Sequence, residues 1–245
     1  MLGNPKATKE ELIRWIKDYF DVNGPTCTAV IGISGGKDSS ICAALLAEAL
    51  GKDRVIGVLM PNGVQADIED SKEVVRCLGI RHAEVNIVKA YDGMISSLKD
   101  INLSRDALIN IPPRLRMATL YAVAQSLKEG GRVCNTCNRS EDYIGYSTKF
   151  GDAAGDFSLL SSLLVEEVLQ IGEETTLPKH LIHKTPSDGL CGLSDEDKIG
   201  FTYKELDHYI LTGEASEEAK KKIDRLHNMN LHKLLPMPSF KLNRA

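Results

Sequence analysis

The sequence predicts an α/β protein with an open, mostly parallel sheet and helices on both of its faces. Three observations predict this fold class. Short runs of apolar and β-branched residues alternate with segments of helical periodicity. Gly51 and Gly79 stand where two of those helical segments end. Parallel strands need a crossover between them, usually a helix, so the alternation indicates a parallel sheet.

The first 140 residues contain most of this alternation. A first helix is expected over residues 9–22, because Thr8 and Glu11 match a capping box. Buried strands are expected at residues 27–33, 54–60, 82–88 and 132–136. Helices are expected at residues 39–50, 67–78, 90–99 and 104–110, and from the following proline pair to residue 128. Pro112 and Pro113 are expected to separate the last two helices, because proline lacks the N–H that a helix interior uses.

The pattern changes after residue 140. A glycine-rich loop at residues 145–156 precedes expected helices at residues 161–171 and 178–184. A polar loop at residues 185–200 precedes two more expected helices, at residues 203–212 and 216–235. A loop of that length in a compact domain usually has a function. The length of 245 residues fits one large α/β domain, so we expect residues 1–245 to form a single domain.

The composition excludes several classes of function. With 34 acidic and 30 basic residues, the net charge of −4 argues against nucleic-acid binding through backbone charge. No run approaches the roughly 18 apolar residues of a membrane-spanning helix, and the N-terminus lacks the apolar segment of a signal peptide. The six scattered cysteines, including Cys134 and Cys137 of a C-x-x-C, are expected to be structural thiols. We therefore expect a cytoplasmic protein with no nucleic-acid or membrane partner.

A glycine pair follows the first predicted strand directly, in the segment Ser34-Gly35-Gly36, and a helix is expected behind it. Ligands of open parallel sheets bind beyond the carboxyl ends of the strands. Glycine lets the backbone approach a ligand closely, and the free N–H groups at a helix start favour an anion. Lys37 adds a positive charge, and Ser39 adds a hydroxyl. The segment therefore predicts a phosphate-binding loop.

Asp38 distinguishes this loop from the common phosphate-binding patterns. Both G-x-x-x-x-G-K-[ST] and G-x-G-x-x-G are absent from the sequence. An aspartate beside a phosphate is unfavourable unless a cation lies between them, so we expect Asp38 to bind Mg²⁺. Taken alone, the segment fits a glycine turn with an ordinary acid at the helix start equally well.

The sequence S-G-G-K-D-S after a buried strand resembles the pyrophosphate-binding loop, S-G-G-x-D-S, of the N-type ATP pyrophosphatases. The resemblance implies a Rossmann-like fold of the adenine nucleotide alpha hydrolase type. It also implies cleavage of ATP between the α and β phosphates, adenylation of a substrate oxygen and displacement of AMP by a nucleophile. This loop does not distinguish between the members of that superfamily.

Later segments are similar to NAD synthetases in particular, in the order that this family has them. They are PNGVQADIED (61–70), NIPPRLRMATLYAVA (110–124), NTCNRSEDYIGYSTKFGDAAGD (135–156), KTPSDGL (184–190), DEDKIGFTYKELDHYI (195–210) and HKLLPMP (232–238). The resemblance covers roughly residues 5–240. Several motifs in the right order are far more specific than the first loop alone.

The resemblance implies roles for individual residues. Asp38 and Glu141 match the family's magnesium-binding pair. The ATP-binding positions are matched by Gly32, Ile33, Ser34, Gly35, Gly36, Lys37, Asp38, Ser39, Gln65, Thr136 and Ser187. The positions that bind deamido-NAD are matched by Arg114, Lys149, Asp156, His232 and Lys233. Taken singly, Glu141 would be a solvent-facing acid at a helix start, and Arg114 or Lys149 a solvated surface charge.

The resemblance also implies a reaction in which deamido-NAD, ATP and ammonia give NAD, AMP and pyrophosphate through an adenylated nicotinate carboxylate. Such a reaction needs two nucleotides held in line and charge neutralised on the departing pyrophosphate, which Lys37, Asp38 and Mg²⁺ would supply. Asp156 would bind or deprotonate ammonium. The chain has no room for the amidase domain of glutamine-using relatives, so we expect free ammonia as the donor. The family resemblance further suggests a homodimer.

Two positions depart from the family pattern. Leu59 and Val165 stand where relatives commonly have an arginine and a lysine on the ATP side, and we expect Lys37 to compensate for one of these charges. Two alternatives remain, a tRNA-modifying adenylating enzyme of the same superfamily and a nucleotide-binding relative without catalysis. The acidic charge balance disfavours the first. The presence of both Asp38 and Glu141 disfavours the second.

Overall fold

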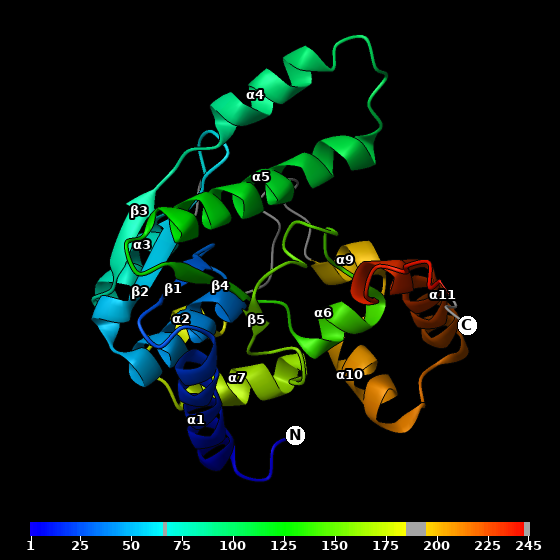
Figure 1. The fold of residues 1–245 in the computed structure, drawn as a ribbon. Helices are drawn as coiled ribbons and strands as arrows, with labels where there is room; N and C mark the ends of the chain where they lie inside the picture. The colour runs from blue at the N-terminus through cyan, green and yellow to red at the C-terminus, as the bar shows by residue number, and fades with distance from the viewer. Residues whose placement is uncertain (66–67, 185–194, 243–245) are drawn as a thin grey trace.

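The computed structural model describes residues 1–65, 68–184 and 195–242, and its centre is a five-stranded parallel sheet (Figure 1). The strand order is β3-β2-β1-β4-β5, and every pairing is parallel. The strands are β1 (Thr28–Gly32), β2 (Val55–Leu59), β3 (Arg81–Glu84), β4 (Gly131–Asn135) and β5 (Phe157–Ser158). The chain runs outward from β1 to β3 and then returns to the other side of β1 as β4. The carboxyl ends of β1 and β4 therefore border the point where the strand order reverses, which is where such sheets bind ligands.

Helices cover both faces of the sheet, as the sequence predicts. One face packs against α1 (Pro5–Asn23), α2 (Lys37–Leu50), α3 (Ile68–Leu78), α7 (Val165–Glu173) and α8 (Lys179–Ile182). The other face lies under α5 (Arg105–Ser126), and α4 (Val88–Ser97) projects beyond α5, as Figure 1 shows. In β1, Ala29 and Ile31 belong to the first apolar layer and Val30 to the second, and all three are fully buried. Successive side chains of this strand thus pack alternately into the two apolar layers.

A third apolar cluster holds a smaller helical unit beside the sheet. The unit contains α6 (Arg139–Ile144), α9 (Asp195–Ile199), α10 (Tyr203–Thr212) and α11 (Glu217–Leu234). Ile144, Leu206 and Ile223 form its fully buried centre. Figure 1 shows the unit to the right of the sheet. Because α6 follows β4 directly, this unit fixes the residues that come after the carboxyl end of β4.

The four strands predicted from the sequence all form, and the helix predicted at residues 203–212 has those bounds. The third strand is shorter than predicted, because β3 ends at Glu84. Asn86 turns the chain there, since its side-chain oxygen accepts hydrogen bonds from the N–H groups of Gly63 and Val88. Among the described helices, none combines the length and the hydropathy that crossing a bilayer requires.

The predicted start of the first helix is wrong. α1 begins at Pro5, and Asn4 is its N-cap, with a side-chain oxygen that accepts a hydrogen bond from the Ala7 N–H. Thr8 lies inside the helix, and its hydroxyl donates to the Asn4 carbonyl. Asparagine is as good an N-cap as threonine or better, and proline is favoured in the first turn of a helix. A helix that starts at Pro5 therefore has preferred residues at both positions.

The predicted break at the proline pair is also wrong, because α5 is continuous through Pro112 and Pro113. Each proline removes one amide donor from the helix. Tertiary packing offsets this loss. Pro112 is buried, and a Cβ built on Gly151 would lie 2.9 Å from the Pro113 Cβ.

Three short elements were not predicted, namely α6, β5 and α9. The helix predicted at residues 161–171 begins at Val165, and η1 (Lys52–Arg54) precedes β2. The polar loop predicted at residues 185–200 is described only from residue 195, where α9 begins. Short elements of this kind have too few residues to show a period in the sequence.

Candidate active site

The predicted phosphate-binding loop lies at the carboxyl end of β1. Gly32 ends the strand, the buried Ile33 donates its N–H to the Val58 carbonyl, and α2 begins at Lys37. No side chain of the described residues caps α2 at its N-cap, Gly36. The N–H groups of the first turn are therefore available to an anion.

Gly35 is required by its conformation and by its neighbours. Its φ of +79° lies in the region that L side chains rarely adopt. A Cβ at this position would come within 3.1 Å of both the Asp70 Cβ and the Ser71 amide nitrogen at the start of α3. The loop can therefore sit this close to α3 only with a glycine here.

Two serines hold the shape of the loop. The hydroxyl oxygens of Ser34 and Ser39 lie 3.0 Å apart. Ser34 accepts a hydrogen bond from the Gly36 N–H, and Ser39 donates one to the Gly36 carbonyl. These bonds fix the loop without a ligand, so a phosphate would meet a preformed site.

Lys37 and Asp38 form an ion pair at the start of α2. The Lys37 Nζ lies 2.7 Å from Asp38 Oδ2, and Lys37 is 4% exposed. The second oxygen of Asp38 accepts a hydrogen bond of 3.2 Å from the side-chain nitrogen of Asn138. Asn138 follows β4, so this bond crosses the point of strand reversal between β1 and β4.

Asn138 also positions Glu141. It is the N-cap of α6, and its side-chain oxygen accepts from the Glu141 N–H at 3.0 Å. Glu141 completes the capping box by accepting from the Asn138 N–H at 3.2 Å. Burial and the nearby charge of Asp38 raise the pKa of Glu141 well above the ordinary value of a glutamate. The structure therefore brings the two predicted metal ligands together.

The donor set fits a hard divalent cation. Asp38 and Glu141 offer carboxylate oxygens, which suit Mg²⁺, Ca²⁺ or Mn²⁺ better than soft metals. A cation between them would also relieve the repulsion that raises the pKa of Glu141. The described residues contain no group of three or more candidate ligand side chains, so oxygens of a ligand would complete the coordination.

Of the remaining predicted ATP-binding residues, two lie after neighbouring strands and one is outside the described residues. Thr136 is half-buried directly after β4, and Gln65 is half-buried after β2. Ser187 lies outside the described residues. The two departures from the family pattern are buried: Leu59 ends β2 in the main apolar layer, and Val165 packs in the third apolar cluster. Neither position would hold a solvated charge without disturbing the core.

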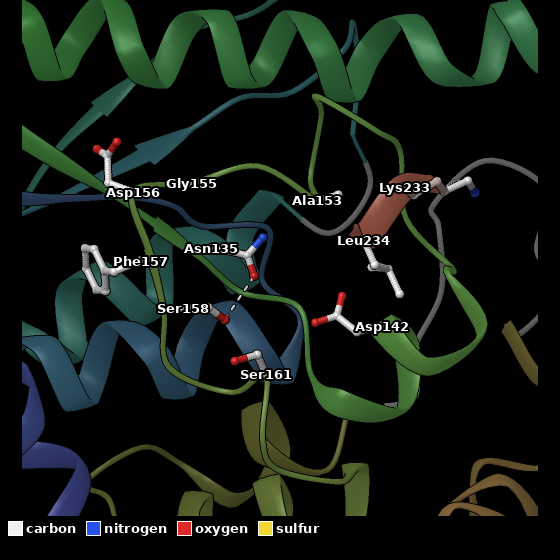
Figure 2. Close-up of a pocket in the computed structure, with 10 residues that line it drawn as sticks. All are labelled: Asn135, Asp142, Ala153, Gly155, Asp156, Phe157, Ser158, Ser161, Lys233 and Leu234. Carbon is white, nitrogen blue, oxygen red and sulfur yellow. Dashed lines mark hydrogen bonds between the residues drawn. The ribbon is translucent and has the colours of Figure 1, made fainter. Parts of the chain in front are cut away.

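A pocket of about 400 Å³ opens beside α6 (Figure 2). It is lined by Asn135, Asp142, Ala153, Gly155, Asp156, Phe157, Ser158, Ser161, Lys233 and Leu234. The lining comes from the ends of β4 and β5, from α6 and from α11. Two of the predicted dinucleotide-binding residues, Asp156 and Lys233, are part of it.

Asp156 holds neighbouring elements together. One carboxylate oxygen accepts a hydrogen bond of 2.7 Å from the Val133 N–H of β4, and the other accepts one of 3.1 Å from the Tyr121 hydroxyl of α5. Burial and the charge of Asp156 raise the pKa of Tyr121 to about 12, so the phenol stays protonated and donates. Figure 2 shows the Asp156 carboxylate turned away from Asp142 and Lys233.

The predicted cationic residues gather where α5, the loop after α6 and the end of α11 meet. Arg114 donates to the Lys149 carbonyl at 3.2 Å, and Lys149 donates to the His232 carbonyl. Lys233 donates to the carbonyls of Gly145 and Ser147 at 2.8 and 3.0 Å, and burial lowers its pKa. The structure therefore joins residues from three distant parts of the sequence into one positive cluster.

Sequence reasoning missed Asn138, Asp142 and Lys184. Asn138 was readable, because Asn-x-x-Glu is a helix-start pattern. Lys184 reaches the loop from the end of α8, with its Nζ 2.6 Å from an oxygen of Asp70, which adjoins Gly35. No local signal points to Asp142, because its importance comes from the pocket into which it projects.

Comparisons with known proteins agree with these features. A family model described as NAD synthase matches residues 8–245. The NH(3)-dependent NAD(+) synthetase of Pyrococcus furiosus is 44% identical over 182 residues, covering 74% of this chain and 70% of the relative. That of Carboxydothermus hydrogenoformans is 37% identical over 238 residues, covering 95% and 96%. The solved structure of NMN synthetase from Francisella tularensis has a TM-score of 0.90 at 32% identity, covering 98% of this chain and 99% of that one.

Proposed function

This chain belongs to the NAD synthase family, and we propose that it is a ligase that converts deamido-NAD, ATP and ammonia into NAD, AMP and pyrophosphate. Its curated relatives are named NH(3)-dependent NAD(+) synthetases. One observation of the structure carries the proposal. Asp38 and Glu141, which come from opposite sides of the strand reversal, converge at the end of a preformed glycine loop through Asn138.

In this proposal the glycine loop binds the β and γ phosphates of ATP. The N–H groups at the start of α2 would donate to phosphate oxygens, and Lys37 would neutralise charge on the departing pyrophosphate. Asp38 and Glu141 would hold a Mg²⁺ ion, which would supply further neutralisation of that charge. Asn138 would keep the two carboxylates at a fixed separation.

The cationic cluster supplies the second nucleotide site. Arg114, Lys149, His232 and Lys233 would bind the phosphates and the ribose of deamido-NAD, because arginine and lysine donors suit phosphate oxygens. Asp156 would keep the β4 edge of that site in place through its bonds to Val133 and Tyr121. The nicotinate carboxylate would then attack the α phosphate of ATP, and ammonia would displace AMP from the adenylate.

The setting of the enzyme is also proposed. We place it in the cytoplasm, because ATP and deamido-NAD are intracellular metabolites. We take residues 1–245 as one catalytic domain and expect a homodimer, as the family resemblance suggests. Measurement of the mass in solution by light scattering tests the dimer.

The direct test of the function is product analysis. The purified chain is incubated with deamido-NAD, MgATP and ammonium, and NAD, AMP and pyrophosphate are expected in equal amounts. The double variant Asp38→Asn, Glu141→Gln is the matched control and should form none of them. Release of ADP instead of AMP, or AMP without NAD, would overturn the proposal.

A second candidate substrate is the mononucleotide. The high structural similarity to an NMN synthetase, at 32% identity over nearly both chains, favours it. The chemistry at the carboxylate would be the same, without the adenylate half of the dinucleotide. Comparison of kcat/KM for deamido-NAD and for nicotinate mononucleotide distinguishes the two substrates, and the larger value identifies the physiological one.

A further inference from the structure

Asp142 is an acidic side chain that projects into the pocket beside α6 and that no group of the described residues binds. Figure 2 shows its carboxylate pointing toward the space between Ser158 and Leu234. Across the described residues, no donor forms a hydrogen bond or an ion pair with that carboxylate. A half-buried carboxylate without such a partner is unfavourable for the empty protein, which is typical of a group that meets a ligand.

Several other polar residues of the pocket already have partners. The Asn135 amide donates to the carbonyls of Asp152 and Ala154 and accepts from the Cys137 N–H. Asp156 is held by Val133 and Tyr121, and Lys233 by two backbone carbonyls. In Figure 2 the Lys233 ammonium points away from Asp142. Lys233, the lysine that lines the pocket among the described residues, therefore directs its ammonium to backbone carbonyls and not to Asp142.

The pocket adjoins the carboxylates that face the glycine loop. Asp142 donates its N–H to the Asn138 carbonyl, so the two residues lie one helical turn apart on α6. A turn of four residues rises about 6 Å. Asn138 in turn contacts Asp38 at the loop. A small molecule at Asp142 would therefore lie beside the helix whose N-cap contacts the loop.

We propose that Asp142 binds the ammonium ion that becomes the amide nitrogen of the product, in place of Asp156, whose two oxygens already accept hydrogen bonds from Val133 and Tyr121. This inference rests on the proposed function. Ammonium is the dominant form of ammonia at neutral pH, and it is a small cation with four N–H donors. The Asp142 carboxylate and the hydroxyls of Ser158 and Ser161 are acceptors that line the pocket, and Figure 2 shows the two serines together on the side opposite Asp142. Asp142 is thus a positioning residue for the nucleophile.

The step balances without another reactant. Bound ammonium releases one proton to solvent and becomes ammonia. The ammonia nitrogen forms a bond to the nicotinate carbonyl carbon while the bond from that carbon to the AMP oxygen breaks, and AMP leaves with the electron pair. A second proton leaves the nitrogen, and the amide remains. Asp142 concentrates and orients the nitrogen before the first of these events.

The kinetic test compares a charged and a neutral nucleophile. Asp142→Asn should raise KM for ammonium about tenfold or more at pH 8. KM for hydroxylamine, which is neutral at this pH and gives the hydroxamate, should stay within about twofold, as should KM for ATP and for deamido-NAD. Glu129→Gln removes the same charge on an exposed loop and should change none of these values. An equal rise for both nucleophiles, or a rise confined to deamido-NAD, overturns the proposal.

A binding measurement tests the same site without turnover. Ammonium chloride should raise the melting temperature of the wild-type chain above its value in equimolar tetramethylammonium chloride, which has the same charge and no N–H donor. Asp142→Asn should abolish that difference. Equal melting temperatures for the wild-type chain in the two salts overturn the proposal. If the wild-type chain makes no NAD, the proposed function fails, and this measurement alone decides whether ammonium binds at Asp142.

Discussion

Asn138→Ala should weaken both the folded state and catalysis, because one fully buried side chain holds both of the carboxylates proposed to bind the metal. Its oxygen caps α6 through the Glu141 N–H, and its nitrogen donates to Asp38. Loss of an N-cap costs about 1 kcal/mol. Loss of a hydrogen bond to a charged group costs about 1.5–3 kcal/mol. The free energy of unfolding should therefore fall by about 2.5–4 kcal/mol.

Two further substitutions separate the contributions of Asn138. Asn138→Ser keeps a good N-cap and loses the bond to Asp38, so it should recover about 1 kcal/mol of stability without recovering activity. Asn138→Asp keeps the cap and places a third carboxylate beside Asp38 and Glu141. It should be less stable than the serine variant without metal and should regain stability when Mg²⁺ is added.

Urea denaturation measures the stability of each variant, and the rate of NAD formation measures activity. Asn4→Ala is the matched control, since Asn4 caps α1 with the same geometry far from the loop. It should lose about 1 kcal/mol of stability and no activity. The reasoning fails if Asn138→Ala is as stable as the wild-type chain, or if Asn138→Ser is fully active.

Three other substitutions or conditions test the loop and its acids. Lys37→Ala should weaken ATP binding about tenfold or more in calorimetry, because it removes a charge from the phosphate site, and unchanged affinity would exclude that role. Gly35→Ala should lower stability by more than the roughly 1–2 kcal/mol expected for a side chain at positive φ. Gly213→Ala, at a φ of +75° with no atom near its Cβ, measures that cost alone, and equal losses would contradict the close contact with α3. Without metal, the folded chain retains protons on Glu141 and Asp142 that the unfolded chain has released. Stability should thus fall as pH rises from the ordinary Asp value of 3.8 through about 6 and beyond. Thermal melts from pH 4 to 8 should show this fall, and Mg²⁺ should reduce it; a rise in stability over that range without metal would contradict the raised pKa values.

The sequence was sufficient for four of the five strands and for the glycine loop, because these depend on local patterns. A buried run before Ser34-Gly35-Gly36 and a helix after it specify the loop, and alternating strands and helices specify parallel pairing. The prediction at the proline pair failed for a tertiary reason. Pro113 fits against Gly151, 38 positions along the chain, and no local rule contains that contact.

The candidate site was predictable where chemistry follows residue type and unpredictable where it follows orientation. Asp38 and Glu141 were expected to converge, and they do. Asp156 has the residue type of a ligand-binding acid, yet both of its oxygens accept hydrogen bonds from Val133 and Tyr121. From the sequence alone, Asp142 cannot be distinguished from an ordinary acid in the first turn of a helix. Only the structure shows that it lines a pocket. Such distinctions depend on which donors the fold brings close to each carboxylate.

The bond between Asp38 and Asn138 spans 100 positions of the chain. During synthesis the glycine loop is therefore complete long before the residues that face it have been made. A nucleotide that needs both halves cannot assist the early part of the chain to fold, since it stabilises only molecules in which β4 has joined β1. A newly made chain would thus bind the nucleotide only after β4 has paired with β1. Fragments that end before β4 would not bind it and would not be stabilised by it.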